Sequence, residues 1–164
     1  MIRLAAVVLV AIAAPLQAKD SLGVFGDWGA FRDELRNGGG SRCYAIAMPA
    51  PSRLQRDHEP YATIATWPRR NVRGQVHFRL SREVRNAAAI TLQMNGKRFA
   101  LTGGAANAWA RDRAMDAAIV AAMRSASRMT VSSVDRSGRR FSNTYMLDGA
   151  SSAMDAATVA CARR

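Results

Sequence analysis

A strict alternation of apolar and polar residues over positions 75–81 is the feature that most constrains the fold of this chain. Val76, Phe78 and Leu80 fall on one side of an extended backbone, and His77 falls on the other. Successive side chains of a β-strand point to opposite faces of a sheet, so this segment predicts a half-buried strand. Comparable short segments, bounded by turn residues, occur at 24–31, 42–48, 61–67, 90–94, 97–102 and 139–147.

Local hairpins connect several of these segments. Asn95-Gly96 separates 90–94 from 97–102, and this dipeptide favours two-residue hairpin turns. Residues 135–138 form a second polar turn, between a strand that begins near Met129 and the segment 139–147. The pattern predicts about seven strands with mainly local, antiparallel connections.

Helical spacing interrupts the strand pattern twice. Within 112–124, Met115, Ile119 and Met123 recur at helical spacing, which predicts a helix lying on the sheet. Ser152 opens a Ser-x-x-acid pattern that predicts a second helix, with Cys161 on its inward face. The sequence therefore predicts a mainly β fold: an antiparallel β-sandwich or partly open barrel with one crossing helix and a C-terminal helix.

The first eighteen residues have the order of a secretory signal peptide. Arg3 precedes an apolar run over 4–14, and Ala18 is a small residue directly before Lys19. The apolar run is shorter than the roughly 20 residues that a membrane-spanning helix needs. We expect cleavage after Ala18, which leaves residues 19–164 as one domain in the periplasm or outside the cell; the alternative is an uncleaved membrane anchor.

Two cysteines, Cys43 and Cys161, are the only ones in the chain. In an oxidising compartment a lone pair is most simply a disulfide, and this one would enclose most of the domain. The alternatives are two free thiols or a metal site. No Cys-x-x-Cys spacing accompanies them, and neither cysteine has a histidine near it in the sequence.

The chain is strongly basic. Its 24 lysine and arginine residues face 12 acidic ones, and loss of Arg3 with the signal leaves 23 basic residues and a formal charge of +11. Such a field attracts anionic polymers and lipid surfaces. The dominance of arginine over lysine has an alternative explanation in a GC-rich genome.

Groups suited to catalysis are sparse. His77 is expected on the solvated face of its strand, and His58 lies in a polar loop between Asp57 and Glu59. One histidine and two adjacent carboxylates need distant ligands to hold a metal ion, so we expect no metal site and no cofactor. The motifs of serine hydrolases, zinc proteases and nucleotide-binding loops are absent from the sequence. The scattered methionines are interpreted as core residues rather than copper ligands.

A short basic loop beside an aromatic residue is the strongest candidate for ligand binding. Guanidinium groups next to an aromatic ring suit phosphate, sulfate or carboxylate groups. The loop contributes Trp67, Arg69, Arg70 and Arg73, and the turn of the second hairpin offers Arg136, Arg139 and Arg140. The alternative is that both are solvated basic turns.

The mature layout resembles the invasion associated locus B family of exported alphaproteobacterial proteins. The resemblance rests on an opening Gly26-Asp27-Trp28, on the cysteine strand around Arg42-Cys43-Tyr44, and on the late segments 117–123, 129–131, 145–150 and 153–155. It implies an envelope-associated β domain without a known catalytic site. The family's further cysteines are absent here, where Cys43 has only Cys161 as a partner.

These observations favour a noncatalytic envelope protein that meets an anionic polymer, lipid head groups or an acidic protein. A periplasmic hydrolase with a site assembled from dispersed residues is the first alternative. An inhibitor or chaperone that binds another exported protein through a sheet edge is the second. Nucleic acid is a weaker candidate because the predicted compartment is wrong for it.

Overall fold

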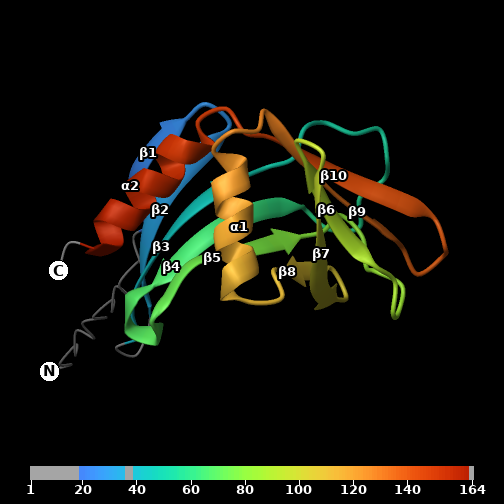
Figure 1. Cartoon of the computed structure of the whole chain (residues 1–164), viewed down its shortest axis with the longest axis horizontal. Helices are drawn as coiled ribbons and strands as arrows, with labels where there is room; N and C mark the ends of the chain where they lie inside the picture. The colour runs from blue at the N-terminus through green and yellow to red at the C-terminus, as the bar shows by residue number, and fades with distance from the viewer. Residues whose placement is uncertain (1–18, 36–38, 163–164) are drawn as a thin grey trace, which may run out of the picture.

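The computed structural model describes residues 19–35 and 39–162, and the predicted signal peptide over 1–18 lies outside these described residues. One antiparallel sheet of ten strands, in the order β1-β2-β3-β4-β5-β8-β7-β6-β9-β10, forms the body of the protein (Figure 1). The strands are β1 Asp20–Phe25, β2 Trp28–Leu35, β3 Gly40–Ala47, β4 Tyr61–Trp67, β5 Val72–Arg79, β6 Ile90–Met94, β7 Lys97–Gly104, β8 Asn107–Trp109, β9 Arg128–Val134 and β10 Arg140–Met146. The mainly β prediction is confirmed.

Two of the strand predictions need correction. The segment 24–31 is not one strand, because the chain reverses at Gly26 and Asp27 between β1 and β2. Gly26 has a φ of +53°, a left-handed conformation that glycine adopts without steric cost. The three-residue β8, which pairs with both β5 and β7, was not predicted. The sheet therefore has ten strands rather than about seven.

Both predicted helices are present. Helix α1 spans Arg113–Met123, and the Asp112 side chain caps it by accepting a hydrogen bond from the Met115 N–H. Helix α2 spans Ala150–Ala162, so it begins two residues before the predicted Ser152. A short 3₁₀ helix, η1 (Pro68–Arg70), connects β4 to β5. No helix within the described part of the chain is long and apolar enough to cross a membrane.

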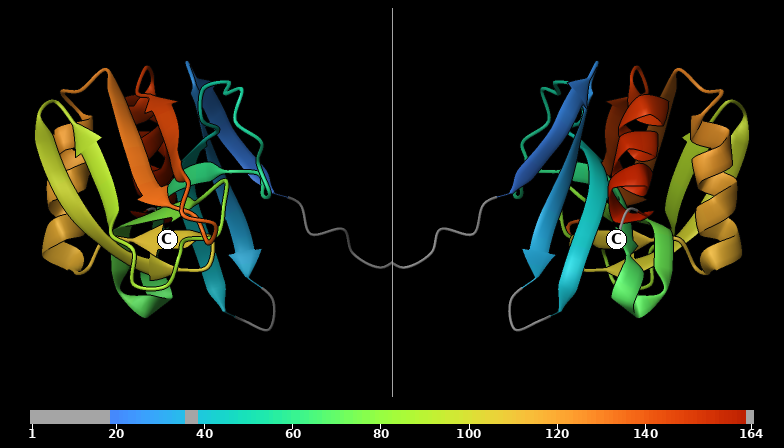
Figure 2. Two further views of the ribbon diagram at one scale, coloured as in Figure 1. Left: turned by 90° about the vertical axis from the view of Figure 1, so that its right-hand side faces the viewer. Right: turned by 90° about the vertical axis from the view of Figure 1, so that its left-hand side faces the viewer.

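The core lies between the two halves of the curved sheet and is closed by the helices. Helix α2 packs on β1–β4 and α1 packs on β5, and Figure 2 shows α2 with β1 and β2 on one side of it and α1 on the other. The alternation predicted for 75–81 is observed, because Val76 and Phe78 of β5 and Leu80 directly after it are all fully buried. Cys43 and Ala45 of β3 face the same core.

The sheet does not close into a barrel, but short links join its two ends. The buried Trp28 on β2 donates its indole N–H to the Met146 carbonyl of β10 at 2.9 Å. The Asp27 N–H donates to the Asp148 carbonyl at 3.2 Å, next to the same corner. The partly open barrel of the sequence prediction is thus the observed architecture.

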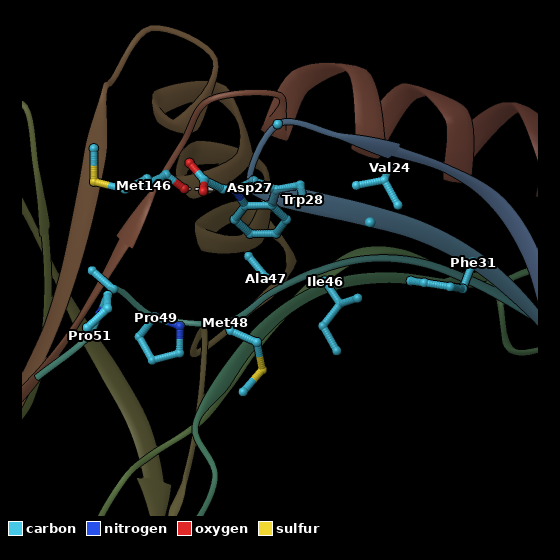
Figure 3. A pocket seen from close by; sticks show the side chains of 13 residues that line it. Val24, Asp27, Trp28, Phe31, Ile46, Ala47, Met48, Pro49, Pro51 and Met146 are labelled. Carbon is cyan, nitrogen blue, oxygen red and sulfur yellow. Dashed lines mark hydrogen bonds between the residues drawn. The ribbon is translucent and has the colours of Figure 1, made fainter.

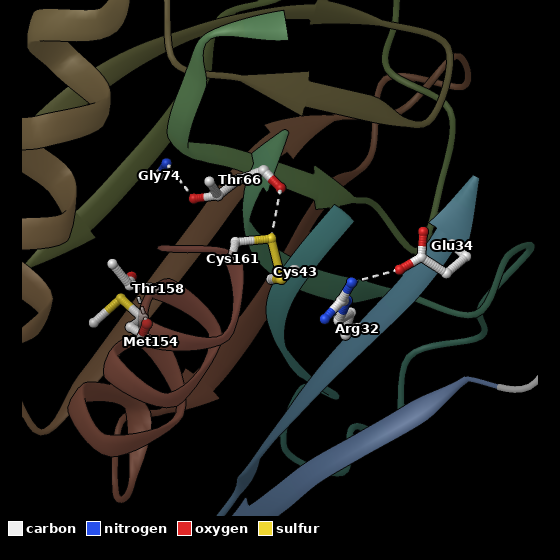
Figure 4. The surroundings of a disulfide bond; sticks show 8 residues. All are labelled: Arg32, Glu34, Cys43, Thr66, Gly74, Met154, Thr158 and Cys161. Carbon is white, nitrogen blue, oxygen red and sulfur yellow. Dashed lines mark hydrogen bonds and ion pairs between the residues drawn. A yellow bond between two sulfur atoms is a disulfide. The ribbon is translucent and has the colours of Figure 1, made fainter. Parts of the chain in front are cut away.

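The predicted disulfide is confirmed. Cys43 on β3 is bonded to Cys161 near the end of α2, and both residues are buried (Figure 4). Their Cα atoms are 5.8 Å apart across a sequence separation of 118 residues. The bond fastens the C-terminal helix to the inner face of the sheet.

Candidate functional site

The tryptophans and tyrosines of the chain divide into a buried group and a group that lines one groove. Trp28 and Tyr145 are fully buried in the core. The other two tryptophans and the other two tyrosines all line one groove on the outer face, which we define as the face of the sheet that points away from the core. This aromatic groove has a volume of about 460 Å³ and is lined by Lys19, Arg42, Tyr44, Ile46, Tyr61, Thr63, Ala65, Trp67, Gln75, His77 and Trp109.

Strand β4 forms the floor of the aromatic groove. Its outward positions run from Tyr61 through the short Thr63 and Ala65 to Trp67, so two small residues lie between two large rings. Across the sheet, Ala65 is paired with Tyr44 on one neighbouring strand. Because the walls are large and the floor is small, the face is hollowed where Thr63 and Ala65 lie.

An ion pair and a ring contact fix the cationic side of the groove. The Arg42 guanidinium bonds the Asp33 carboxylate and also lies 4.5 Å from the centroid of the Tyr44 ring. Burial raises the pKa of the Tyr44 hydroxyl, and the nearby Asp33 carboxylate raises it further. Tyr44 is therefore a neutral hydroxyl at physiological pH, and Arg42 is held in place at the rim.

His77 is a member of the groove rather than the solvated strand residue that we predicted. Its ring lies 5.0 Å from Trp109 and 5.8 Å from Tyr61, measured between centroids. Nε2 donates to the Asn107 side-chain oxygen at 3.0 Å, which leaves Nδ1 as an acceptor in the neutral ring. Burial lowers the pKa of His77 against a smaller raising effect of the Asn107 hydrogen bond, so the neutral form is favoured.

A second, apolar groove adjoins the aromatic groove at Ile46, which lines both (Figure 3). Its volume is about 520 Å³. Val24, Met48 and Met146 line it and are 74%, 53% and 43% exposed. Met146 thus departs from the prediction that the methionines are core residues. The remaining lining residues are Gly26, Asp27, Trp28, Gly29, Phe31, Ala47, Pro49, Ala50 and Pro51.

The predicted basic loop lies at one end of the aromatic groove. Trp67 lines the groove and directly precedes η1, in which Arg69 and Arg70 are exposed. The stem of Arg69 lies against Gly40, and Arg73 is exposed at the start of β5. The structure therefore brings this loop and the groove together.

The second predicted basic cluster is separate from the first. Arg136 pairs with Glu83 at 2.8 Å, and Arg139 pairs with the buried Asp135 at 3.4 Å. Arg140 is exposed at the start of β10. The turn that carries these arginines is at the far end of the molecule from η1 (Figure 1). Two of its three charges are thus already balanced by acidic neighbours.

The two histidines line separate hollows. His58 lies 4.0 Å from the Glu83 carboxylate, in the hollow that also contains Arg136. Among residues 19–35 and 39–162, no group of three or more acidic, histidine or cysteine side chains could hold a metal ion. The aromatic groove itself was missed at the level of sequence, although the large-small-small-large pattern of β4 was visible there.

The fold and its grooves define a disulfide-bonded, partly open β-barrel domain with two adjoining hollows on its outer face. A family model described as invasion associated locus B (IalB) protein matches residues 38–158. The chain belongs to this family, as the resemblance indicated. No curated protein matches the chain, and no solved structure does. The opening Gly26-Asp27-Trp28 and the second cysteine, Cys161, lie outside the matched residues.

Proposed function

We propose that this protein is a noncatalytic, exported binding protein of the bacterial envelope, which holds an anionic ligand at the Trp67 end of its outer face. Family membership and the disulfide support export to an oxidising compartment. The observation that carries the proposal is the position of Trp67. Its ring lines the aromatic groove, and Arg69 and Arg70 follow it directly in η1.

The chemistry of this end suits an anion that is part of a larger ligand. A planar ring provides apolar contact area at low conformational cost, and exposed guanidinium groups donate paired hydrogen bonds to phosphate or carboxylate. We name the surface formed by Trp67, Arg69, Arg70 and Arg73 the basic ridge. The net positive charge of the whole domain adds long-range attraction for the same ligands.

A charge-matched pair of variants tests the basic ridge. Arg70→Gln/Arg73→Gln removes two exposed charges from the ridge, and Arg98→Gln/Arg128→Gln removes two exposed charges from β7 and β9. Binding of the mature protein to lipopolysaccharide and to polyglutamate would be measured by isothermal titration calorimetry over a salt series. We expect the ridge variant to bind about tenfold more weakly and the control to change less than about twofold.

Two outcomes would contradict this proposal. If the wild-type protein shows no salt-sensitive binding to either polyanion, the ligand is not anionic. If the ridge and control variants lose affinity equally, the polyanions are attracted by net charge alone and the basic ridge is not a binding site.

A further inference from the structure

The two grooves on the outer face have opposite chemistry and share a wall. Ile46 lines both, so the aromatic groove continues into the apolar groove along β3. Their volumes, about 460 and 520 Å³, are each within the range of small-molecule sites. A single ligand that lies across Ile46 would therefore contact rings, hydroxyl-binding groups and cations at one end, and mainly apolar side chains beside Asp27 at the other.

The apolar groove concentrates the exposed hydrophobic residues of the described chain. Five large hydrophobic residues are exposed in the described part of the chain. Three of them, Val24, Met48 and Met146, line the apolar groove. Leu54 and Val159 are the other two. Scattered apolar residues are ordinary on a protein surface, but a cluster of this kind indicates a surface that is covered by an apolar ligand or partner.

The aromatic groove has the side chains that hold sugar rings. The negative face of an aromatic ring attracts the polarised C–H groups of a sugar, and Trp67, Trp109 and Tyr61 supply such rings. Gln75 and the neutral His77 offer donors and acceptors to sugar hydroxyls. The Arg42 charge is balanced by Asp33, but Lys19 also lines the groove and adds a positive charge, so an acidic or phosphorylated sugar is favoured over a neutral one.

We propose that the outer face binds an anionic glycolipid, with its sugar head group in the aromatic groove and an acyl chain along the apolar groove. This inference rests on the proposed function for the envelope location and the negative charge of the ligand. A polysaccharide alone would leave the apolar groove uncovered. A phospholipid would leave the ring-lined groove without a sugar to hold.

Three probes separate the parts of such a ligand: intact lipopolysaccharide, the same material after complete deacylation, and phosphatidylglycerol vesicles. We expect the mature protein to bind intact lipopolysaccharide at least about tenfold more tightly than the deacylated form, because acyl chains add apolar contact. Phosphatidylglycerol vesicles should bind more weakly than lipopolysaccharide and should not displace it.

Two matched pairs of variants locate the contacts. Val24→Ser/Met48→Ser removes exposed apolar side chains from the apolar groove, and Leu54→Ser/Val159→Ser does the same elsewhere. The first variant should bind intact lipopolysaccharide no more than about twofold more tightly than the deacylated form, with its affinity for the deacylated form unchanged. The second variant should keep the wild-type affinity for both forms.

Gln75→Glu places a negative charge in the aromatic groove and should weaken the binding of both forms of lipopolysaccharide about tenfold. Gln93→Glu on β6 should leave both affinities unchanged.

Equal affinity for intact and deacylated lipopolysaccharide would overturn the inference. Full displacement of lipopolysaccharide by phosphatidylglycerol vesicles, or a Gln75→Glu variant that binds lipopolysaccharide like wild type, would also overturn it. Circular dichroism of each variant establishes that it is folded. The basic ridge is tested separately. If Arg70→Gln/Arg73→Gln binds lipopolysaccharide like wild type while the groove variants bind it more weakly, the basic ridge is contradicted and the glycolipid site is supported. If only the ridge variant binds more weakly, the glycolipid site alone is contradicted.

Discussion

Cys161 is bonded to Cys43 across 118 residues of sequence, and the bond holds α2 on the inner face of β3. A link of this kind limits the unfolded chain much more than the folded one, because it closes a loop that includes nearly the whole domain. The outer face of the same strand carries Arg42, Tyr44 and Ile46. The disulfide therefore stabilises the strand on which the two grooves meet.

Removal of the disulfide should destabilise the domain strongly. The chain-entropy model gives about 4.7 kcal/mol for a loop of about 100 residues, and we expect Cys43→Ala/Cys161→Ala to lose about 4 to 5 kcal/mol. Urea unfolding of the oxidised wild type and of the double variant measures this difference. Reduced wild type should behave like the variant, and a loss below about 1 kcal/mol would contradict the role of the bond.

Gly149 should tolerate no side chain, whereas Gly138 should. Both have a positive φ, +77° and +85°, so alanine is strained at either position. A Cβ at Gly149 would lie 1.8 Å from the Phe25 carbonyl oxygen, but one at Gly138 has no atom within 4 Å. We expect Gly138→Ala to cost about 1 kcal/mol and Gly149→Ala more than about 4 kcal/mol in thermal or urea unfolding. Similar losses at the two positions would show that the β1–β2 turn does not pack on this corner.

A buried hydrogen bond joins α1 to the sheet. The Asp116 carboxylate accepts from the Val76 N–H at 2.8 Å, and burial raises the pKa of this carboxyl. Asp116→Ala leaves a buried amide without an acceptor and should cost about 1 to 3 kcal/mol. Asp116→Asn keeps an oxygen at this position and should unfold within about 1 kcal/mol of wild type. An alanine variant as stable as the asparagine variant would argue against the hydrogen bond.

Acid should destabilise the domain through His77. Burial lowers the pKa of this histidine in the folded protein, so near pH 6 the unfolded chain binds more protons and acid favours unfolding. The stability that the neutral ring provides is present above the unfolded pKa of about 6.5 and is lost as the pH falls through the window below it. His77→Gln should show a smaller loss of unfolding free energy between about pH 7.5 and about pH 5. If the unfolding free energies of wild type and His77→Gln fall in parallel with decreasing pH, the pH dependence arises from groups other than His77.

Much of the fold could be predicted from local patterns. Alternation in 75–81 and the Asn95-Gly96 dipeptide identified elements whose side chains and turns follow directly from local sequence. The turn at Gly26 was missed because the residues on both sides favour strands and the reversal depends on one glycine. The three-residue β8 was missed because so short a segment has no period to detect, and it is a strand only through pairing with β5 and β7.

The candidate site was predicted only in part for a similar reason. Trp67 and the arginines after it are adjacent in the sequence, so their cluster was visible. Trp109 and Tyr44 join them only through the pairing of β3, β4, β5 and β8, which no local pattern specifies. Charge alone could not separate the two arginine clusters, because the pairing of Arg136 with Glu83 is a tertiary contact.

The indole N–H signals of Trp67 and Trp109 test the central claim, that an anionic ligand occupies the outer face, most directly. Both rings line the aromatic groove, whereas Gln93 on β6 lines neither groove. In a ¹⁵N–¹H NMR titration of residues 19–164 with lipopolysaccharide, we predict that the Trp67 and Trp109 signals shift or broaden while the backbone N–H signal of Gln93 stays. Binding that leaves the Trp67 and Trp109 signals unchanged would contradict the account.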